Sequence, residues 1–147
     1  MNGSFAASLA EFADEVKGSI ETVFREVIIE IGSSVITMSP VDSGRFKGNW
    51  QYSINSPKQG ELDRLDPTGE AATAELIEGA LQFKVGETAF IVNNAPYALK
   101  LEFGGYNGPT EKVNESGYSR LAPKGMVRVT LERFERIVEE TIRKHQV

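Results

Sequence analysis

The sequence predicts an α+β fold, in which a long N-terminal helix and a C-terminal helix pack on one face of a small, mostly antiparallel sheet. Apolar residues recur every three or four positions over 5–38 and again over 123–145, which is helical spacing. Short alternating segments, bounded by residues that favour turns, lie between them and are typical of strands. Long helices at the two ends of the chain, with short strands between them, favour an α+β domain. A length of 147 residues suits one domain over 1–147.

The first helix is expected to end near Met38. A proline disfavours the α conformation in the residue before it, and Pro40 follows Ser39. Asp42 and Ser43 can bond nearby backbone N–H groups, and Gly44 tolerates positive φ. The chain should therefore turn sharply here, from the helix into a strand.

The middle of the chain predicts three strands, one short helix and a long loop. A strand over 48–56 would place Trp50, Tyr52 and Ile54 on one side. The loop, 57–70, is polar and rich in breakers, and Thr68 is expected to cap a helix over 69–79. Two further strands are expected at 81–85 and 88–93. Residues 97–103 fit both strand and helix spacing.

A second long loop, 104–120, precedes the last helix. Tyr106 and Tyr118 lie on this loop, and tyrosines of this kind often contact a partner protein. The helix is expected over about 123–145, with Pro123 in its first turn. Its apolar stripe would consist of Val127, Leu131, Phe134, Val138 and Ile142.

Composition argues against several classes of function. The net charge of −5 is unlike that of a free-standing duplex-DNA binder. Without cysteine there is no thiolate metal site or cysteine nucleophile, and the single histidine, His145, is expected to be a solvated tail residue. No apolar run approaches the length of a membrane span, and no nucleotide-binding motif occurs. We therefore expect no catalytic residues, no cofactor and no metal, and a small hydrolase is disfavoured.

Three motifs occur in a fixed order. The first is Pro-Val-Asp-Ser-Gly-Arg-Phe-Lys-Gly-Asn-Trp, which ends at Trp50. The second is Asn-Ala-Pro-Tyr-Ala-Leu-Lys-Leu-Glu-Phe-Gly, which covers 94–104, and the third is Leu-Ala-Pro-Lys-Gly-Met-Val, which covers 121–127. Together they resemble the small tail-completion and head–tail joining (neck) proteins of long-tailed bacteriophages, with Ser43 in place of the commoner threonine.

The resemblance implies a structural virion protein at the junction between neck and tail, made in the cytoplasm of the bacterial host. Its subunits would form a ring, commonly a hexamer, through head-to-tail contacts. The ring would contact the neck connector and the tail-tube or tail-terminator proteins, and would enclose the DNA path without sequence-specific binding. The resemblance also implies a short helical or irregular segment over 97–103. The alternative is a cytoplasmic protein-interaction module, such as a regulator or a toxin–antitoxin component, without catalytic activity.

The candidate structural and interface residues come from the motifs and the second loop. Trp50 is expected in the core of a structural elbow, or else at an interface. Glu102, if buried, needs a charged or hydrogen-bonding partner, and Arg45 and Lys47 are the expected partners. The full set is Pro40, Asp42, Gly44, Arg45, Trp50, Tyr97, Glu102, Tyr106 and Tyr118.

Overall fold

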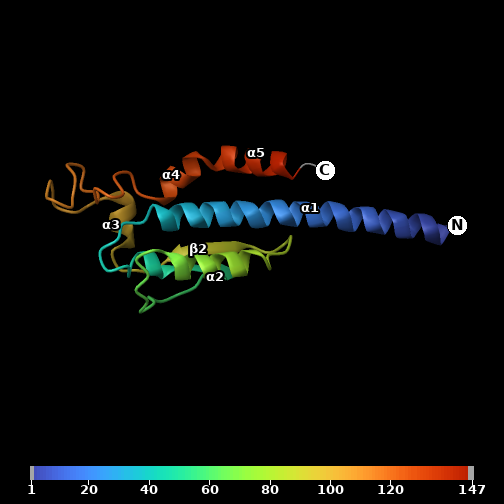
Figure 1. Ribbon diagram of the computed structural model, residues 1–147, viewed down its shortest axis with the longest axis horizontal. Helices are drawn as coiled ribbons and strands as arrows, with labels where there is room; N and C mark the ends of the chain where they lie inside the picture. Colours follow the sequence, from blue (N-terminus) through green and yellow to red (C-terminus); the bar gives the residue numbers. More distant parts are fainter. Residues whose placement is uncertain (1, 146–147) are drawn as a thin grey trace.

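The structure is a computed structural model that describes residues 2–145, with side chains described from residue 7 onward. One long helix, α1 (Asn2–Thr37), runs through the middle of the molecule. On one side of it lie α2 (Glu70–Ala80) and a sheet made of β1 (Trp50–Ile54) and β2 (Ala89–Asn93), as Figure 1 shows. On the other side lie α4 (Val127–Glu132) and α5 (Phe134–Lys144). The short helix α3 (Ala98–Phe103) lies near the C-terminal end of α1.

The α+β class is confirmed, and the long N-terminal helix ends where Pro40 predicts. The sheet has two antiparallel strands, with Trp50 opposite Asn93 and Ile54 opposite Ala89. The layers differ in one respect from the expected arrangement, because the C-terminal helices pack on α1 and not on the sheet. The contact between Ser34 of α1 and Thr130 of α4, at 2.8 Å between hydroxyl oxygens, belongs to this interface.

The prediction of a strand over 81–85 is wrong. Gln82 and Phe83 donate backbone hydrogen bonds to the last turn of α2, so this segment continues as a turn. Phe83 is buried and its ring lies 5.8 Å from that of Phe24 in α1. The apolar pattern here comes mainly from Phe83, which packs on α1 and holds the turn in place. So short a pattern does not distinguish such a turn from a strand.

Asp66 is the main cap of α2, and Thr68 adds one longer contact, because its hydroxyl accepts the N–H of Glu70 at 3.3 Å. The Asp66 carboxylate accepts hydrogen bonds from the backbone N–H groups of Ala71 and Ala72, at 3.3 and 2.9 Å. Gly69 is the first flanking residue and has φ 78°. A buried aspartate that accepts N–H groups of the first helical turn acts as a helix cap. Asp66 does so from three residues before Gly69, the usual N-cap position.

The single helix expected over 123–145 is wrong in two respects. Pro123 lies in a turn before the helix. The helix is interrupted at Arg133, which separates α4 from α5. The expected inward stripe is also partly outside, since Leu131, Phe134 and Ile142 are 55%, 42% and 47% exposed. Thr130 and Thr141 are buried instead, and each donates its hydroxyl to a backbone carbonyl four residues earlier, so their polar groups are satisfied.

His145 is not the solvated residue that its position predicts. Its Nε2 is hydrogen-bonded to the Glu26 carboxylate of α1 at 2.5 Å, and Lys144 lies 3.6 Å from the same carboxylate. The histidine hydrogen bond lowers the pKa of Glu26 in spite of its partial desolvation. The end of α5 is thus attached to the middle of α1.

The prediction that Trp50 lies in the core is confirmed. Trp50 is 6% exposed, and its Nε1–H donates to the Ser39 hydroxyl at 2.7 Å. Ser39 in turn donates to the Val35 carbonyl at 2.6 Å, so the end of α1 and the start of β1 share one hydrogen-bonded chain.

Replacing Trp50 by alanine is expected to lower the free energy of unfolding by about 3–5 kcal/mol, because it leaves a large cavity. Urea unfolding followed by circular dichroism would measure this loss. Trp50→Phe is the matched control, since it keeps most of the buried ring and removes the hydrogen bond. A loss below about 1 kcal/mol for the alanine variant would contradict the burial of the ring.

Candidate functional site

The three motifs of the sequence meet in one part of the molecule. The rings of Phe46 and Tyr97 lie 5.9 Å apart, which joins the first motif to the second. Asn93, the residue before the second motif, donates its side-chain N–H to the Phe46 carbonyl at 2.8 Å. Glu102 then joins the second motif to the third, through hydrogen bonds from Met126 and Val127. Segments far apart in the chain therefore form one continuous unit.

The turn after α1 places Gly44 at the centre of the first motif. Gly44 has φ 89°, and a Cβ at this position would collide with the backbone of Pro67. Its carbonyl accepts hydrogen bonds from Gly48 and Asp66. Both the backbone conformation and the close approach of the 57–70 loop require glycine here.

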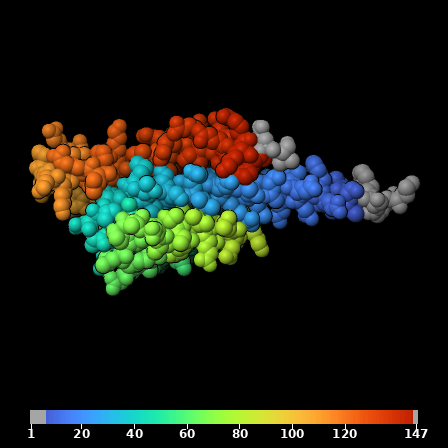
Figure 2. All heavy atoms as spheres, in the orientation of Figure 1, coloured from blue at the N-terminus to red at the C-terminus, as the bar shows by residue number. Residues whose placement is uncertain are grey.

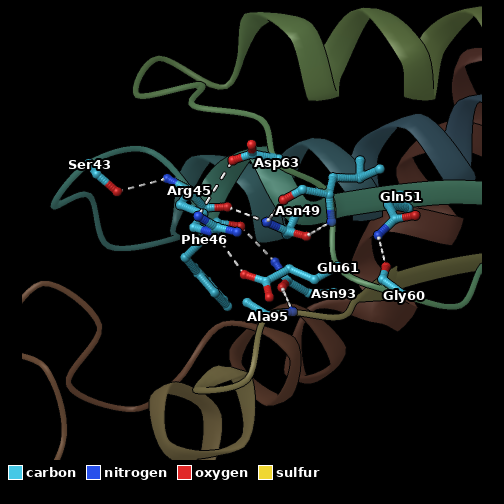
Figure 3. Close-up of polar contacts among 11 residues, drawn as sticks. Ser43, Arg45, Phe46, Asn49, Gln51, Gly60, Glu61, Asp63, Asn93 and Ala95 are labelled. Atoms are coloured by element: carbon cyan, nitrogen blue, oxygen red, sulfur yellow. Dashed lines mark hydrogen bonds and ion pairs between the residues drawn. The ribbon is translucent and has the colours of Figure 1, made fainter.

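Arg45 and Asn49 hold the 57–70 loop against the first motif (Figure 3). The Arg45 guanidinium lies 2.7 Å from Glu61 and 3.5 Å from Asp63. Asn49 is fully buried, accepts the N–H of Leu62 at 2.7 Å and donates to the Leu62 carbonyl at 3.1 Å. Asn49 was not among the candidates predicted from the sequence. A side-chain amide both donates and accepts, so it can pair with the N–H and the carbonyl of one residue in a neighbouring segment, as a strand does.

Arg64 also fastens this loop, and sequence reasoning missed it. Its side chain donates to the carbonyls of Gly48 and Trp50, at 2.8 and 3.2 Å, and lies 2.7 Å from Glu75 of α2. The 57–70 loop therefore belongs to the packed body, and its own contacts are sufficient to order it.

Glu102 is the central charged residue of the unit, and it is 8% exposed. The prediction that Arg45 or Lys47 is the partner of Glu102 is wrong. Its carboxylate accepts the backbone N–H groups at the start of α4, at 2.8–3.1 Å, from Met126, Val127 and Arg128. Burial raises the pKa of Glu102, but these hydrogen bonds and the Arg128 guanidinium at 3.1 Å outweigh it, so the pKa lies below the usual value.

The Arg128 side chain contacts three groups near the end of α3: Glu102, Phe103 and Tyr118. Besides Glu102, its guanidinium lies 4.8 Å from the centre of the Phe103 ring and donates to the Tyr118 hydroxyl at 2.8 Å. Tyr118 therefore attaches the 104–120 loop to α4 within the same chain. It is half-buried, and its hydroxyl is bonded within the chain.

The 104–120 loop is ordered by its own hydrogen bonds. Gly105 and Tyr106 both donate their N–H groups to the Gly117 carbonyl, at 3.1 Å each. Val113 and Ser119 form an isolated antiparallel bridge. These contacts within the chain account for the conformation of the loop.

The first two motifs and the 104–120 loop enclose a cleft of about 630 Å³ at the end of the molecule opposite the N-terminus of α1. Its apolar wall is formed by Pro40, Phe46, Tyr97, Leu101, Tyr106 and Leu121. Burial raises the pKa of both tyrosines, so their hydroxyls stay protonated and available as donors. The cleft is therefore an apolar site with two polar tips, suited to a side chain or short segment of another protein.

Charged groups of both signs lie at the rim of the cleft. Asp42 and Lys112 approach each other to 3.7 Å across it, with side chains that are 94% and 82% exposed. A pair this exposed adds little stability and can separate when another surface approaches. Among residues 2–145 there is no group of three or more His, Cys, Asp or Glu placed to hold a metal ion.

None of the helices in the described part of the chain is both long enough and apolar enough to cross a bilayer. Comparisons with protein-family models, with curated proteins and with solved structures found no match. The resemblance to phage tail-completion proteins therefore depends on the three motifs alone.

Replacing Glu102 by glutamine is expected to lower the free energy of unfolding by about 1–3 kcal/mol, because the amide leaves backbone donors unsatisfied. The pH dependence should change as well. A carboxylate whose pKa is lowered on folding stabilises the protein above its unfolded pKa of about 4.3, and this stabilisation is lost as the pH falls through the folded value. Urea unfolding between neutral pH and about pH 3 would measure both effects.

The control for this prediction is Asp42→Asn, which removes an exposed carboxylate and should change neither quantity. Double-mutant cycles on the free energy of unfolding identify the residue that interacts with Glu102. Glu102→Gln should couple to Arg128→Met and should be additive with Arg45→Met. Additivity with Arg128 would contradict the assignment of this arginine as the partner.

Proposed function

We propose that the protein is a structural, non-catalytic subunit of a ring at the neck–tail junction of a long-tailed bacteriophage. The observation that carries the proposal is that the three motifs form one packed unit, and that the first two of them, with the 104–120 loop and Leu121 of the third, line one open, apolar cleft. The motifs lie up to about eighty positions apart in the chain, yet they share hydrogen bonds and one packed surface. The cleft is suited to a protein partner, because its walls are apolar and its charges lie at the rim.

The position of the cleft supports head-to-tail assembly. Its lining residues lie at one end of an elongated molecule, far from the exposed residues 7–18 of α1 at the other end (Figure 2). Contacts between different surfaces of identical subunits close into a ring when the rotation between neighbours divides a full turn. The neighbouring subunit, or the adjoining neck or tail protein, would insert a side chain or short segment into the cleft.

The charge of the chain supports a role around DNA without binding it. The net charge is −5, so the inner wall of such a ring would repel phosphate groups and leave the DNA free to pass. In this role the protein would be made in the bacterial cytoplasm and would end up in the virion, between the connector and the tail tube or tail terminator.

Negative-stain electron microscopy and native mass spectrometry of the purified protein would test the proposal. A closed ring with a central hole is expected, with six subunits as the number that the resemblance implies. A protein that stays monomeric or dimeric at high concentration, with and without candidate neck and tail partners, would favour the alternative of a protein-interaction module.

Leu121→Glu is expected to prevent ring formation, because it puts a charge on the apolar wall of the cleft. Leu121 is 69% exposed, so the variant should fold normally. Leu99→Glu is the matched control, since Leu99 is 73% exposed and does not line the cleft. If both variants form rings as well as the parent protein, the cleft is not the contact between subunits.

A further inference from the structure

The two outer edges of the sheet differ in what covers them. The sheet has two strands, so each strand has one edge that the other strand does not pair with. The 57–70 loop covers the outer edge of β1, because Arg64 of this loop donates to the carbonyls of Gly48 and Trp50. The outer edge of β2 is the free edge of the sheet.

The register of the sheet shows which backbone groups of β2 face this free edge. The Asn55 N–H donates to the Thr88 carbonyl at 2.7 Å, in the same register as the paired strands. Backbone groups of successive residues in a strand point to opposite edges, so those of Phe90 and Val92 face β1, as the Thr88 carbonyl does. The outward N–H and carbonyl groups belong to the alternate residues: Ala89, Ile91 and Asn93.

These outward groups are unpaired in the single chain. Among the hydrogen bonds within residues 2–145, none reaches the backbone N–H or carbonyl of Ala89, Ile91 or Asn93. The whole strand is half-buried, so its edge is accessible at the surface. A row of N–H and carbonyl groups at every second residue matches one kind of ligand, an extended polypeptide strand.

The sequence of β2 lacks the features that usually keep a sheet edge from pairing. Natural edge strands are blocked by charged residues, by proline or by bulges. β2 reads Ala-Phe-Ile-Val-Asn and pairs with β1 residue for residue, without a bulge. No charged residue lies between Glu87 and Lys100, which is the longest uncharged interval in the chain. An edge of this composition is expected to pair with another strand.

We propose that β2 pairs with β2 of a second copy, in antiparallel orientation about a two-fold axis at Ile91. In this register Ala89 lies opposite Asn93 of the second copy, and Ile91 lies opposite the same residue. All the outward groups of the strand then have partners, and two sheets of two strands become one sheet of four. A shift of the register would leave part of each edge unpaired.

The side chains of β2 fit the same register. Ala89 and Ile91 pack on the core, so Phe90 and Val92 lie on the other face of the sheet, where both are half-buried. The two-fold axis places Phe90 of each copy directly opposite Val92 of the other. Aromatic and β-branched side chains in this position form a favourable cross-strand pair, and the arrangement makes two such pairs.

Charge favours a second copy over a charged partner at this edge. The chain has a net charge of −5, so many surfaces of two copies would repel each other. The edge of β2 is neutral, and two copies can approach there without opposing like charges. An acidic or basic segment of another protein would gain no ion pair from β2.

The strand contact does not depend on the proposed ring. None of the residues that line the cleft belongs to β2. A two-fold contact closes on itself after two copies and cannot build a ring alone. The two surfaces can therefore be tested separately on the same purified protein.

Cysteine cross-linking tests the register, because the chain has no cysteine of its own. Phe90→Cys and Val92→Cys chains, mixed and left to exchange, should form a covalent dimer under mild oxidation, since residues directly opposite in paired strands are close enough for a disulfide. Ser53→Cys is the matched control. It lies on the same face of β1, opposite Phe90 and one strand further from the axis, and it should not link to Val92→Cys.

Two results of the cross-linking would overturn the proposal. One is a mixture of Phe90→Cys and Val92→Cys that gives no more dimer than the mixture with Ser53→Cys. The other is a Phe90→Cys chain that links to itself and not to Val92→Cys, which would place the axis at a different residue.

Backbone NMR spectra at increasing concentration test the contact in the unchanged protein. An amide proton shifts downfield when it enters a hydrogen bond, so the Ala89 and Ile91 signals should shift as the copies associate. Phe90 and Val92 already bond β1, and their signals should shift much less. Signals that do not change with concentration would contradict the pairing. If candidate neck or tail proteins shift Ala89 and Ile91 and concentration does not, the edge binds another protein and the self-pairing is wrong.

Ala89→Pro is expected to weaken association of the copies by about tenfold or more, because it removes one outward N–H from each copy. Proline is tolerated at an edge position whose N–H has no partner within the chain. Ala89→Ser keeps this N–H and is the matched control. Sedimentation equilibrium would measure association, and circular dichroism would verify the fold. A proline variant that associates as well as the serine variant would overturn the pairing.

The outcomes for the ring and for the strand pair are distinguishable. Rings that form without a link between Phe90→Cys and Val92→Cys would support the proposed function and overturn the strand pair. A cross-linked dimer that never forms rings would support the strand pair and overturn the junction role.

Discussion

The arrangement of the C-terminal third of the chain depends on one buried carboxylate. Glu102, near the end of α3, accepts the N–H groups at the start of α4, so it determines where the 104–120 loop begins and where the chain turns back along α1. Gly125 supports this geometry, because a Cβ there would collide with Glu102. An anion is stabilised at the positive end of a helix, which explains why a charge is tolerated at a site that is 8% exposed. The position of α4 and α5 on α1 follows from this contact.

The helix α1 has two roles in the molecule. Its C-terminal half is the central layer, covered by α2 and the sheet on one side and by α4 and α5 on the other. Its N-terminal half is mostly surface. Both halves carry the same helical spacing of apolar residues. This pattern predicts an apolar face on the helix but does not identify which element packs on it. The same chain covers this face in the C-terminal half, while residues 7–18 are exposed.

Local chemistry predicted much of the fold. The end of α1 at Pro40, the burial of Trp50 and the strand at 88–93 all follow from short-range rules. The errors have a common cause, because they depend on partners distant in sequence. Glu102 bonds Arg128 and not Arg45, and Asp66 makes the main cap of α2 beside the single contact of Thr68. Thr130 occupies a buried position that the apolar stripe of the last helix was expected to fill. Periodicity identifies a helix and its apolar face, but a hydroxyl that bonds its own helix can be buried as readily as a methyl group.

The exposed N-terminal part of α1, residues 7–18, has a consequence for local stability. A helix of about 12–15 residues or fewer is marginal in water without packing, and Gly18 lowers the propensity of this part further. The backbone hydrogen bonds of residues 7–18 are therefore sustained by propagation from the packed half of α1, and they should open more easily with distance from Val27. Amide hydrogen exchange would then show a gradient along one continuous helix, fast near Leu9 and slow near Val35.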